Sequence, residues 1–384
     1  MSRLVRELGK SKVMKILITG GHLTPALSCM DWIAQNQPSD KLIFVGREFS
    51  QDLLKQEAVE KYEVEKRKIP FIAFSAVRLG RDFYTHFFRE LSRFFQSIKT
   101  AKKIILQQKP TVILSFGGYV AVPFAIAGFL TKTPIVTHEQ TLTTGFANQL
   151  IGFFAKKIAV SFEQSKNEFP NTKTIVTGNP LRAGVFLSRH QKPNWLPKEI
   201  TKPILLVLGG NQGSQVLNEL IINSLTEITK DWLVVHQCGR PTTVRDYFKA
   251  LSTAKSHLPH EQQDNYFVHE WMDEEDLFWL YRNAIGAISR SGANATQEIA
   301  VAGLPAIFVP IPNSHKDEQY KNARWLVDIG AAILIEQAGL SQEVLMLALD
   351  KIQLMQKPMR EALSKLKFEK DAAAKLYELI KAAI

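Results

Sequence analysis

Two consecutive series of short apolar runs, separated by longer segments with helical periodicity, are the dominant pattern of this sequence. Strands that alternate with helices form parallel sheets joined by right-handed crossovers. The sequence therefore predicts an α/β fold in which two Rossmann-like domains face each other. The first series of predicted strands covers residues 15–18, 42–45, 112–116, 134–137, 158–160 and 174–177, and the second covers residues 204–208, 232–235, 266–269, 287–289, 306–309 and 332–335.

The two series meet at the turn Gly178-Asn179-Pro180, which is the predicted domain boundary. The expected domains are residues 1–180 and residues 181–359. Residues 360–384 are rich in lysine, alanine and leucine, and we expect them to form one helix that packs back on the first domain. A chain of 384 residues is also too long for one ordinary hydrophobic core, which favours two domains.

The formal net charge of +11 favours an acidic partner, such as nucleic acid, anionic lipid or a phosphorylated substrate. The two cysteines, Cys29 and Cys238, are far apart and have no CxxC spacing, so a reducing compartment is expected. The N-terminal residues lack the pattern of a signal peptide, and no apolar stretch reaches the ~18 residues that a membrane span needs. The sequence thus predicts a cytoplasmic protein that touches a membrane without crossing it.

Two glycine-rich turns follow predicted strands at equivalent places in the two domains. In such sheets ligands bind at the carboxyl ends of the strands, and the helix that starts beyond the turn offers unpaired N–H groups to a phosphate or a sugar. His22, in the first turn (residues 19–25), has an imidazole suited to a general base, although a capping histidine in a tight turn explains it equally well. The second turn, residues 209–214, is a candidate diphosphate-binding loop.

A third turn begins at Arg290 and leads into a predicted helix that contains Glu298. A carboxylate at that place can accept both hydroxyls of a ribose, and compensation of the helix dipole is the alternative. Metal and nicotinamide sites are not predicted. The sequence has no Cys/His cluster with zinc spacing and no convincing acidic pair for a metal, and neither glycine turn contains GxGxxG. We therefore expect no cofactor.

Residues 65–103 are rich in aromatic and basic side chains. On a helix, part of this segment forms one broad apolar stripe, which a core-facing helix explains. Aromatic residues flanked by lysine and arginine also suit docking on an anionic membrane surface, and Phe129 and Leu130, before Lys132, extend this basic and aromatic patch. The stripe consists of Tyr84, Phe87, Phe88, Leu91, Phe94, Phe95 and Ile98.

Short motifs follow one another along nearly the whole chain: TGGHLTPAL (19–27), SFGGYV (115–120), HEQ (138–140), GNPLR (178–182), GGNQG (209–213), RSGA (290–293), AGLPAIFVP (302–310) and HKDEQYKNA (315–323). In this order they resemble the MurG family of bacterial N-acetylglucosaminyltransferases. The resemblance implies a GT-B architecture, with UDP-GlcNAc held mainly by the second domain and the acceptor and membrane face on the first.

The resemblance also implies a reaction. In that family GlcNAc passes with inversion from UDP-GlcNAc to the MurNAc 4-hydroxyl of lipid I, an undecaprenyl-diphosphate-linked MurNAc-peptide, and the product is lipid II of peptidoglycan synthesis. The expected protein is therefore a peripheral enzyme on the cytoplasmic face of the cell membrane that binds an anionic membrane surface and no nucleic acid.

Roles for individual residues follow from the same resemblance. His22 matches a histidine proposed to activate the acceptor hydroxyl, Arg182 matches an arginine that contacts the donor, and Glu298 matches the residue on the ribose. Thr141, Asn211 and the pair Asn294-Ala295 depart from the residues usual in the family. The further implied substrate-binding residues are Thr19, Gly20, Gly21, Tyr119, Thr141, Asn211, Gln212, Gly213, Met272 (through its backbone, to the uracil), Ala293, Asn294, Ala295, Gln319 and Asn322.

Other interpretations stay open. The same architecture suits a transferase that glycosylates another lipid, such as diacylglycerol, or an enzyme that epimerises UDP-GlcNAc. A basic nucleic-acid-binding module belongs to a different class. It would spread arginines and aromatic residues across a strand face rather than concentrate them beside glycine turns, and we disfavour it.

Overall fold

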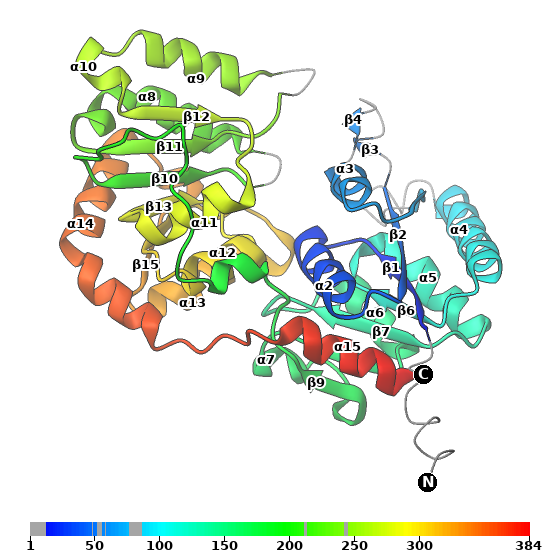
Figure 1. The fold of residues 1–384 in the computed structure, drawn as a ribbon. Coiled ribbons are helices and arrows are strands. Elements are labelled where there is room, and N and C mark those ends of the chain that lie inside the picture. The colour runs from blue at the N-terminus through cyan, green and yellow to red at the C-terminus, as the bar shows by residue number, and fades with distance from the viewer. Residues whose placement is uncertain are drawn as a thin grey trace. The chain divides into compact units, whose positions relative to one another are not determined.

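The structure is a computed structural model that describes residues 13–47, 49–51, 56–57, 59–76, 87–210, 213–241 and 245–384 of the chain. The chain forms two compact units (Figure 1). Unit 1 comprises Met1–Gln140, Thr144–Pro180 and Asp371–Ile384, and unit 2 comprises Thr141–Thr143 and Leu181–Lys370. Each unit is built on one parallel sheet.

Unit 1 has a seven-stranded parallel sheet with the strand order β5-β2-β1-β6-β7-β8-β9. Its strands are β1 (Lys15–Thr19), β2 (Lys41–Gly46), β5 (Phe71–Ala73), β6 (Val112–Ser115), β7 (Ile135–Glu139), β8 (Lys157–Val160) and β9 (Thr174–Val176). Its helices are α2 (Leu23–Asn36), α3 (Val59–Lys66), α4 (Phe87–Gln108), α5 (Gly118–Leu130), α6 (Phe146–Phe154), α7 (Glu163–Lys166), the 3-10 helix η2 (Asn171–Lys173) and α15 (Ala372–Ala383). A short antiparallel pair, β3 (Phe49–Gln51) and β4 (Gln56–Glu57), lies apart from the main sheet.

Unit 2 has a six-stranded parallel sheet with the strand order β12-β11-β10-β13-β14-β15. Its strands are β10 (Ile204–Leu208), β11 (Leu233–Gln237), β12 (Tyr266–His269), β13 (Gly286–Ser289), β14 (Ala306–Phe308) and β15 (Ala332–Leu334). Its helices are η3 (Ala183–Phe186), α8 (Gln215–Asp231), α9 (Tyr247–Ser256), α10 (His260–Gln263), α11 (Glu274–Asn283), α12 (Ala293–Val301), η4 (His315–Asp317), α13 (Glu318–Asp328), η5 (Gln337–Gly339) and α14 (Gln342–Ser364).

Both sheets are covered by apolar side chains on both faces. In β1, Ile16 and Ile18 belong to one buried cluster and Leu17 to another, and in β10 Leu206 and Val207 divide in the same way. Successive strand residues point to opposite faces, so a strand covered on both sides has a continuous apolar sequence. This is why short apolar runs identify the strands of both units.

The predicted α/β fold with two parallel sheets is confirmed. Strand order reverses between β1 and β6 in unit 1 and between β10 and β13 in unit 2. Such a reversal is where ligands bind in open parallel sheets, because the connecting turns leave the sheet in opposite directions. No helix in the described part of the chain is long and apolar enough to span a bilayer.

The prediction of one helix over residues 360–384 is wrong. Helix α14 ends at Ser364, and α15 begins only at Ala372. In the segment between them, Leu366 and Phe368 both pack on the core of unit 2. Side chains two residues apart share a face in an extended chain but not in a helix, so packing on unit 2 favours an extended segment here.

Helix α15 nevertheless packs on the first unit, as the sequence predicted. Leu376 and Ile380 are fully buried in the core of unit 1. Tyr377 donates a hydrogen bond to Asp40 Oδ2 at 2.7 Å, and its ring lies 5.4 Å from the Trp32 ring, centroid to centroid. The C-terminal helix is therefore an integral part of unit 1, although the chain reaches it from unit 2.

Candidate functional site

The carboxyl end of the first sheet carries two glycine turns that touch each other. One follows β1 and the other follows β6. A Cβ on Gly21 would lie 2.1 Å from the Gly117 carbonyl oxygen, and one on Gly118 would lie 2.9 Å from Gly21 Cα. Gly117 and Gly118 also have φ angles of +77° and +74°, a region that favours glycine. This backbone contact leaves the start of α2 next to the start of α5, at the point where strand order reverses.

His22 lies between the first turn and α2. Its backbone is extended, with φ −115° and ψ 106°, and its side chain makes no capping hydrogen bond. Burial lowers the pKa of His22, and the negative charges of Glu139 and Glu60 partly offset that effect. The imidazole is therefore neutral at pH 7, the form that accepts a proton, while nearby carboxylates stabilise the imidazolium that results.

Glu139 is held in place by the polypeptide around it. Its Oε2 atom accepts hydrogen bonds from Asn148 Nδ2 at 2.9 Å and from the Gly145 N–H at 3.3 Å. The neighbouring His138 is fully buried, its Nε2 donates to the Gly178 carbonyl at 3.0 Å, and burial lowers its pKa to about 4. Hydrogen bonds thus fix the position of both side chains.

Three other predicted residues lie at or just after the ends of β1, β6 and β7. Tyr119 OH accepts a hydrogen bond from Arg47 Nη1 at 3.5 Å, and Arg47 also pairs with Glu60 at 3.0 Å. Thr19 is fully buried, and its Oγ1 has no hydrogen-bond partner in the described residues. Thr141 Oγ1 donates to the Thr143 carbonyl at 2.7 Å, and this short segment belongs to unit 2.

The second sheet has an equivalent glycine turn between β10 and α8. Gly213 has a φ of +74°, and a Cβ there would lie 2.2 Å from the Cys238 carbonyl oxygen. Ser214 caps α8, because its Oγ accepts from the Leu217 N–H at 3.4 Å. Helix α8 thus begins at the carboxyl end of the sheet. A helix N-terminus in that place is an arrangement that binds a phosphate. Asn211 and Gln212, which the sequence assigns to this loop, lie outside the described residues.

Arg290 brings a positive charge to this turn. It directly follows β13, and its Nε donates to Ser214 Oγ at 2.9 Å. Its Nη1 donates to the carbonyls of Val309 and Pro310 at 2.9 and 3.2 Å, and its Nη2 donates to Gln337 Oε1 at 3.0 Å. All these partners are neutral, and burial lowers the pKa of the guanidinium. The sequence analysis placed Arg290 at the start of the third turn but did not include it among the predicted binding residues, although its position directly after a strand was an available signal.

A buried chain of hydrogen bonds supports the second turn from below. Asn218 Nδ2 donates to the Cys238 carbonyl at 3.0 Å, and Asn218 Oδ1 accepts from His236 Nε2 at 3.0 Å. With Nε2 protonated, His236 Nδ1 accepts from Tyr266 OH at 2.9 Å. The chain requires a neutral imidazole, and burial lowers the pKa of His236 to about 3.

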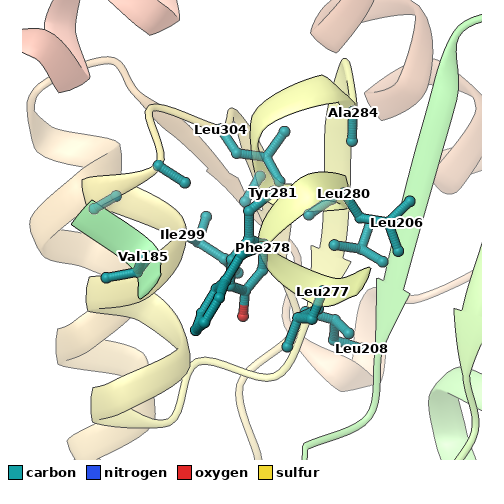
Figure 2. Packing of buried hydrophobic residues seen from close by; sticks show 14 of the residues in the cluster. Val185, Leu206, Leu208, Leu277, Phe278, Leu280, Tyr281, Ala284, Ile299 and Leu304 are labelled. Atoms are coloured by element: carbon teal, nitrogen blue, oxygen red, sulfur yellow. The ribbon is translucent and has the colours of Figure 1, made fainter. Parts of the chain in front are cut away.

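Arg182 and Glu298 form a buried ion pair with two hydrogen bonds. Arg182 Nε donates to Glu298 Oε1 at 2.8 Å and Nη2 donates to Oε2, while Glu298 is only 2% exposed. The carboxylate raises the pKa of Arg182 above its usual value. The pair lies on the apolar cluster of Figure 2, where the Phe278 ring is 4.9 Å from the guanidinium carbon and Tyr281 OH reaches Glu298 Oε2 at 3.5 Å.

The remaining predicted residues of unit 2 gather around the turn after β13. Asn322 Nδ2 donates to the Ser291 carbonyl at 3.0 Å, and Ser291 Oγ donates to the Gln319 carbonyl at 2.8 Å, so both members of the predicted pair on α13 contact this turn. Met272 lies in the turn after β12, where its N–H donates to Gln237 Oε1 at 3.1 Å. The first turn of α12 supplies Ala293, which is buried, and Asn294 and Ala295, which are half-buried.

The described residues contain no group of three His, Cys, Asp or Glu side chains that could hold a metal ion. Unit 1 therefore carries a neutral histidine at a glycine turn. Unit 2 carries a helix N-terminus, a buried arginine with no carboxylate partner among the described residues, and an arginine–glutamate pair. The first group is suited to taking a proton from a hydroxyl. The second group is suited to binding a nucleoside diphosphate and to stabilising negative charge on it.

Comparison with known families and proteins gives concordant matches. Residues 18–160 match the glycosyltransferase family 28 N-terminal domain, and residues 204–376 match the glycosyltransferase family 28 C-terminal domain. The UDP-N-acetylglucosamine–N-acetylmuramyl-(pentapeptide) pyrophosphoryl-undecaprenol N-acetylglucosamine transferase of Leuconostoc mesenteroides is 32% identical over 97% of this chain and 99% of its own length.

Solved structures share the fold. The crystal structure of MurG from Acinetobacter baumannii matches with a TM-score of 0.68 and 25% identity, over 96% of this chain and 99% of that one. The UDP-GlcNAc 2-epimerase of Neisseria meningitidis, solved with UDP-GlcNAc bound, has a TM-score of 0.61 over 96% of this chain and 100% of that one, but only 14% identity. That second likeness shows the fold alone.

The hydrogen-bond chain through His236 predicts acid sensitivity. The unfolded chain binds a proton on this histidine near pH 6.5 and the folded chain only near pH 3, so the unfolded state holds more protons between these values. The unfolding free energy therefore falls as pH drops through this window, by up to about 1.4 kcal/mol per pH unit. We expect His236→Asn to lose this proton linkage. The slope of its unfolding free energy against pH, measured by urea unfolding between about pH 6 and pH 4, should be smaller by up to about 1.4 kcal/mol per pH unit.

The matched control is His257→Asn, which removes an exposed imidazole at the end of α9. It should keep the pH dependence of the unmodified protein. An unchanged slope in His236→Asn would contradict the structure of this hydrogen-bond chain, whatever the stability of the variant at neutral pH.

Proposed function

The chain belongs to the MurG family of glycosyltransferase family 28, the UDP-N-acetylglucosamine–N-acetylmuramyl-(pentapeptide) pyrophosphoryl-undecaprenol N-acetylglucosamine transferases, and we propose that it performs this transfer through the residues described above. It is a UDP-sugar-dependent N-acetylglucosaminyltransferase with a GT-B fold. The donor is UDP-GlcNAc, and the acceptor is the MurNAc 4-hydroxyl of an undecaprenyl-diphosphate-linked MurNAc-peptide. The product is lipid II of peptidoglycan synthesis.

The observation that carries this proposal is the pair of glycine turns, one at each reversal of strand order. In unit 2 the donor diphosphate binds at Gly213 and the N-terminus of α8, together with Asn211 and Gln212, which the sequence assigns to the same motif. Helix N–H groups and the Arg290 guanidinium stabilise the negative charge that grows on UDP as it leaves. Arg290 is suited to this role because its protein partners are neutral, so a diphosphate supplies the counter-charge.

The rest of the donor binds around the other turns of unit 2. The uracil binds at the backbone of Met272, the ribose hydroxyls bind Glu298, and the GlcNAc contacts Gln319, Asn322 and the first turn of α12. Glu298 has lone pairs for this role because an ionised carboxylate accepts about four hydrogen bonds and Arg182 uses one site on each oxygen. Arg182 then acts on the donor by fixing the orientation of Glu298 as well as by its charge.

The acceptor hydroxyl loses its proton to His22 as it attacks the anomeric carbon. A neutral imidazole with a lowered pKa accepts that proton, and Glu139 and Glu60 stabilise the resulting cation. Gly20 and Gly21 let the acceptor approach the backbone, with Thr19 and Tyr119 beside it. A direct displacement inverts the anomeric centre, and a retaining mechanism would need a carboxylate free to form a covalent sugar intermediate. Glu139 does not fit that need, because Asn148 and the Gly145 N–H hold it.

Two alternatives concern the acceptor and the reaction type. A related transferase acting on diacylglycerol would release UDP with that lipid instead. An epimerase of this fold would change UDP-GlcNAc without any acceptor. Measuring UDP release and sugar products with the MurNAc-peptide lipid, with diacylglycerol and without an acceptor separates the three reactions.

We also propose that unit 1 docks on an anionic membrane through α5 and α6. Four apolar side chains on or beside these helices are exposed: Phe129 (62%), Leu130 (56%), Phe146 (63%) and Phe153 (78%). We call these four residues the exposed apolar patch. The Phe129 ring lies 5.5 Å from that of Phe154, centroid to centroid, which joins the two helices. Lys132 follows α5, and Lys173 Nζ donates to the Phe153 carbonyl at 3.2 Å, so basic residues adjoin the patch and suit anionic headgroups.

The predicted stripe on α4 divides between two environments. Phe94 packs against the core of unit 1, whereas Phe95 is 56% exposed. Tyr84 lies outside the described residues, as do the side chains of Phe87 and Phe88. Docking through the surface of α5 and α6 would place the enzyme at the cytoplasmic face of the cell membrane as a peripheral protein.

The donor site is tested by titration calorimetry. The protein should bind UDP and UDP-GlcNAc, and Arg290→Gln should weaken UDP binding by roughly 10- to 100-fold, because a hydrogen bond to a charged group is lost. Binding of uridine, which has no phosphate, should change far less. Arg324→Gln, an exposed arginine of α13, is the control. Absence of affinity for every uridine diphosphate compound would overturn the proposed function.

The catalytic base is tested by turnover. His22→Ala should keep the affinity for UDP-GlcNAc and lose about 10²- to 10⁴-fold in kcat, the usual contribution of a general base. His257→Ala, at an exposed histidine, should keep both. If His22→Ala turned over at the normal rate, His22 would have no part in the chemistry.

The membrane surface is tested by sedimentation with phosphatidylglycerol vesicles. Replacing Phe129 and Phe153 together by serine should lower vesicle binding about tenfold or more, since each buried phenylalanine is worth roughly 1.5–3 kcal/mol. The control replaces Leu347 and Leu354, which are 70% and 82% exposed on α14 of unit 2, by serine. Equal losses in the two double variants would assign membrane binding to another surface.

A further inference from the structure

A second positively charged pocket lies in unit 2, away from the residues proposed to bind the donor. Its volume is about 330 Å³. Arg282 at the end of α11, Gly303 after α12 and Arg360 near the end of α14 line it together with Ser364. Leu366 and Phe368, from the segment between α14 and α15, complete an apolar side. Of the residues that the structure describes, none proposed for the uridine, diphosphate or sugar lines this pocket.

Both guanidinium groups are held rigidly by backbone carbonyls. Arg360 donates from Nη1 to Gly303 O at 3.1 Å and from Nη2 to Ala284 O at 2.6 Å. Arg282 donates from Nη2 to Val185 O at 2.8 Å and more weakly from Nη1 to Ala302 O at 3.4 Å. These bonds fix the two heads and use only part of the five N–H donors that each arginine has.

The positive charge in the pocket is not neutralised by protein carboxylates. Within the described residues, neither Arg282 nor Arg360 forms an ion pair, and the buried Nε of Arg360 has no hydrogen-bond partner. Burial lowers the pKa of both, and the charge of Arg282 lowers that of Arg360 further. Arg182 in the same unit shows the opposite behaviour, because Glu298 raises its pKa. Carbonyl dipoles carry only partial charge, so a full counter-charge is missing.

We infer that this pocket binds a phosphate group, with Arg282 and Arg360 as its ligands. Planar guanidinium groups match the oxygen geometry of phosphate and bind it with pairs of hydrogen bonds. Two fixed cations match the double negative charge of a phosphate monoester or of inorganic phosphate near neutral pH. The apolar side formed by Leu363, Leu366 and Phe368 suits a phosphate that carries an organic group.

A ligand here would also order the segment that joins the two units. Leu366 and Phe368 belong to the stretch between α14 of unit 2 and α15 of unit 1. Phe368 packs edge-on against Trp325, with ring centroids 6.2 Å apart. A bound phosphate beneath these side chains stabilises their position, so amide hydrogen exchange in residues 365–370 should slow when the pocket is occupied.

The test is calorimetric titration of the full-length protein, saturated with UDP so that the donor site is filled. The probes are inorganic phosphate and a water-soluble short-chain phosphatidic acid, which distinguish a free anion from a lipid headgroup. Arg360→Gln should weaken binding of the better probe about tenfold or more. Lys357→Gln removes the same charge from an exposed position one turn away on α14 and should change it less than about threefold.

A second variant leaves both arginines intact. Ser364 lines the pocket and is exposed, so Ser364→Glu places a competing carboxylate beside the guanidinium groups and should weaken binding about tenfold or more. Ser364→Gln has the same size without the charge and should bind normally. If neither probe bound the unmodified protein, the inference would be overturned. Equal affinity of Ser364→Glu and Ser364→Gln for the better probe would overturn it as well. Because these variants leave every residue proposed for the donor unchanged, this result is independent of the proposed donor site.

Discussion

The backbone contact between Gly21 and Gly117 is the constraint on which the candidate site of unit 1 depends. Two helices can start next to each other at the reversal of strand order only because neither turn has a side chain at the point of contact. Gly213 plays the same part in unit 2, where it packs against the Cys238 carbonyl. In both units the glycine therefore does more than permit a turn: it brings a helix N-terminus close to the edge where a ligand binds.

The buried polar groups of unit 2 fix the positions of the side chains and turns that they contact more than they add to the stability of the fold. A buried ion pair such as Arg182–Glu298 contributes little net stability over an apolar replacement of similar size, because both charges lose their hydration. It does fix the direction of each carboxylate oxygen. The chain from Asn218 through His236 to Tyr266 acts in the same way on the glycine turn, since each group has one allowed donor or acceptor role. Rigid placement of charge is what stabilisation of a departing diphosphate needs.

The sequence predicted what depends on local pattern. Apolar runs marked most strands, because strands covered on both faces have no alternation, and the glycine turns fall after β1 and β10, as predicted. The short strand β5 and the break between α14 and α15 were missed, since packing on distant residues decides them; Leu366 and Phe368 leave the helix to reach the core of unit 2. Contacts distant in sequence were missed for the same reason. Nothing local indicates that Arg182 pairs with Glu298, or that Arg290 bonds to Ser214, although each residue stands in a recognisable motif.

Four buried or half-buried arginines of unit 2 differ in whether a carboxylate neutralises their charge. This difference bears on where unit 2 binds its ligands. Arg182 has a carboxylate partner, whereas Arg290, Arg282 and Arg360 have only neutral partners among the described residues, and their pKa values are lowered. Burying a cation without a counter-ion costs stability, and a fold retains that cost most readily where a ligand supplies the missing charge. Arg290 lies at the helix N-terminus proposed for the donor diphosphate, which follows this rule. Arg282 and Arg360 are half-buried, and they too lack a carboxylate partner among the described residues. Their pocket is therefore where we infer a second anion.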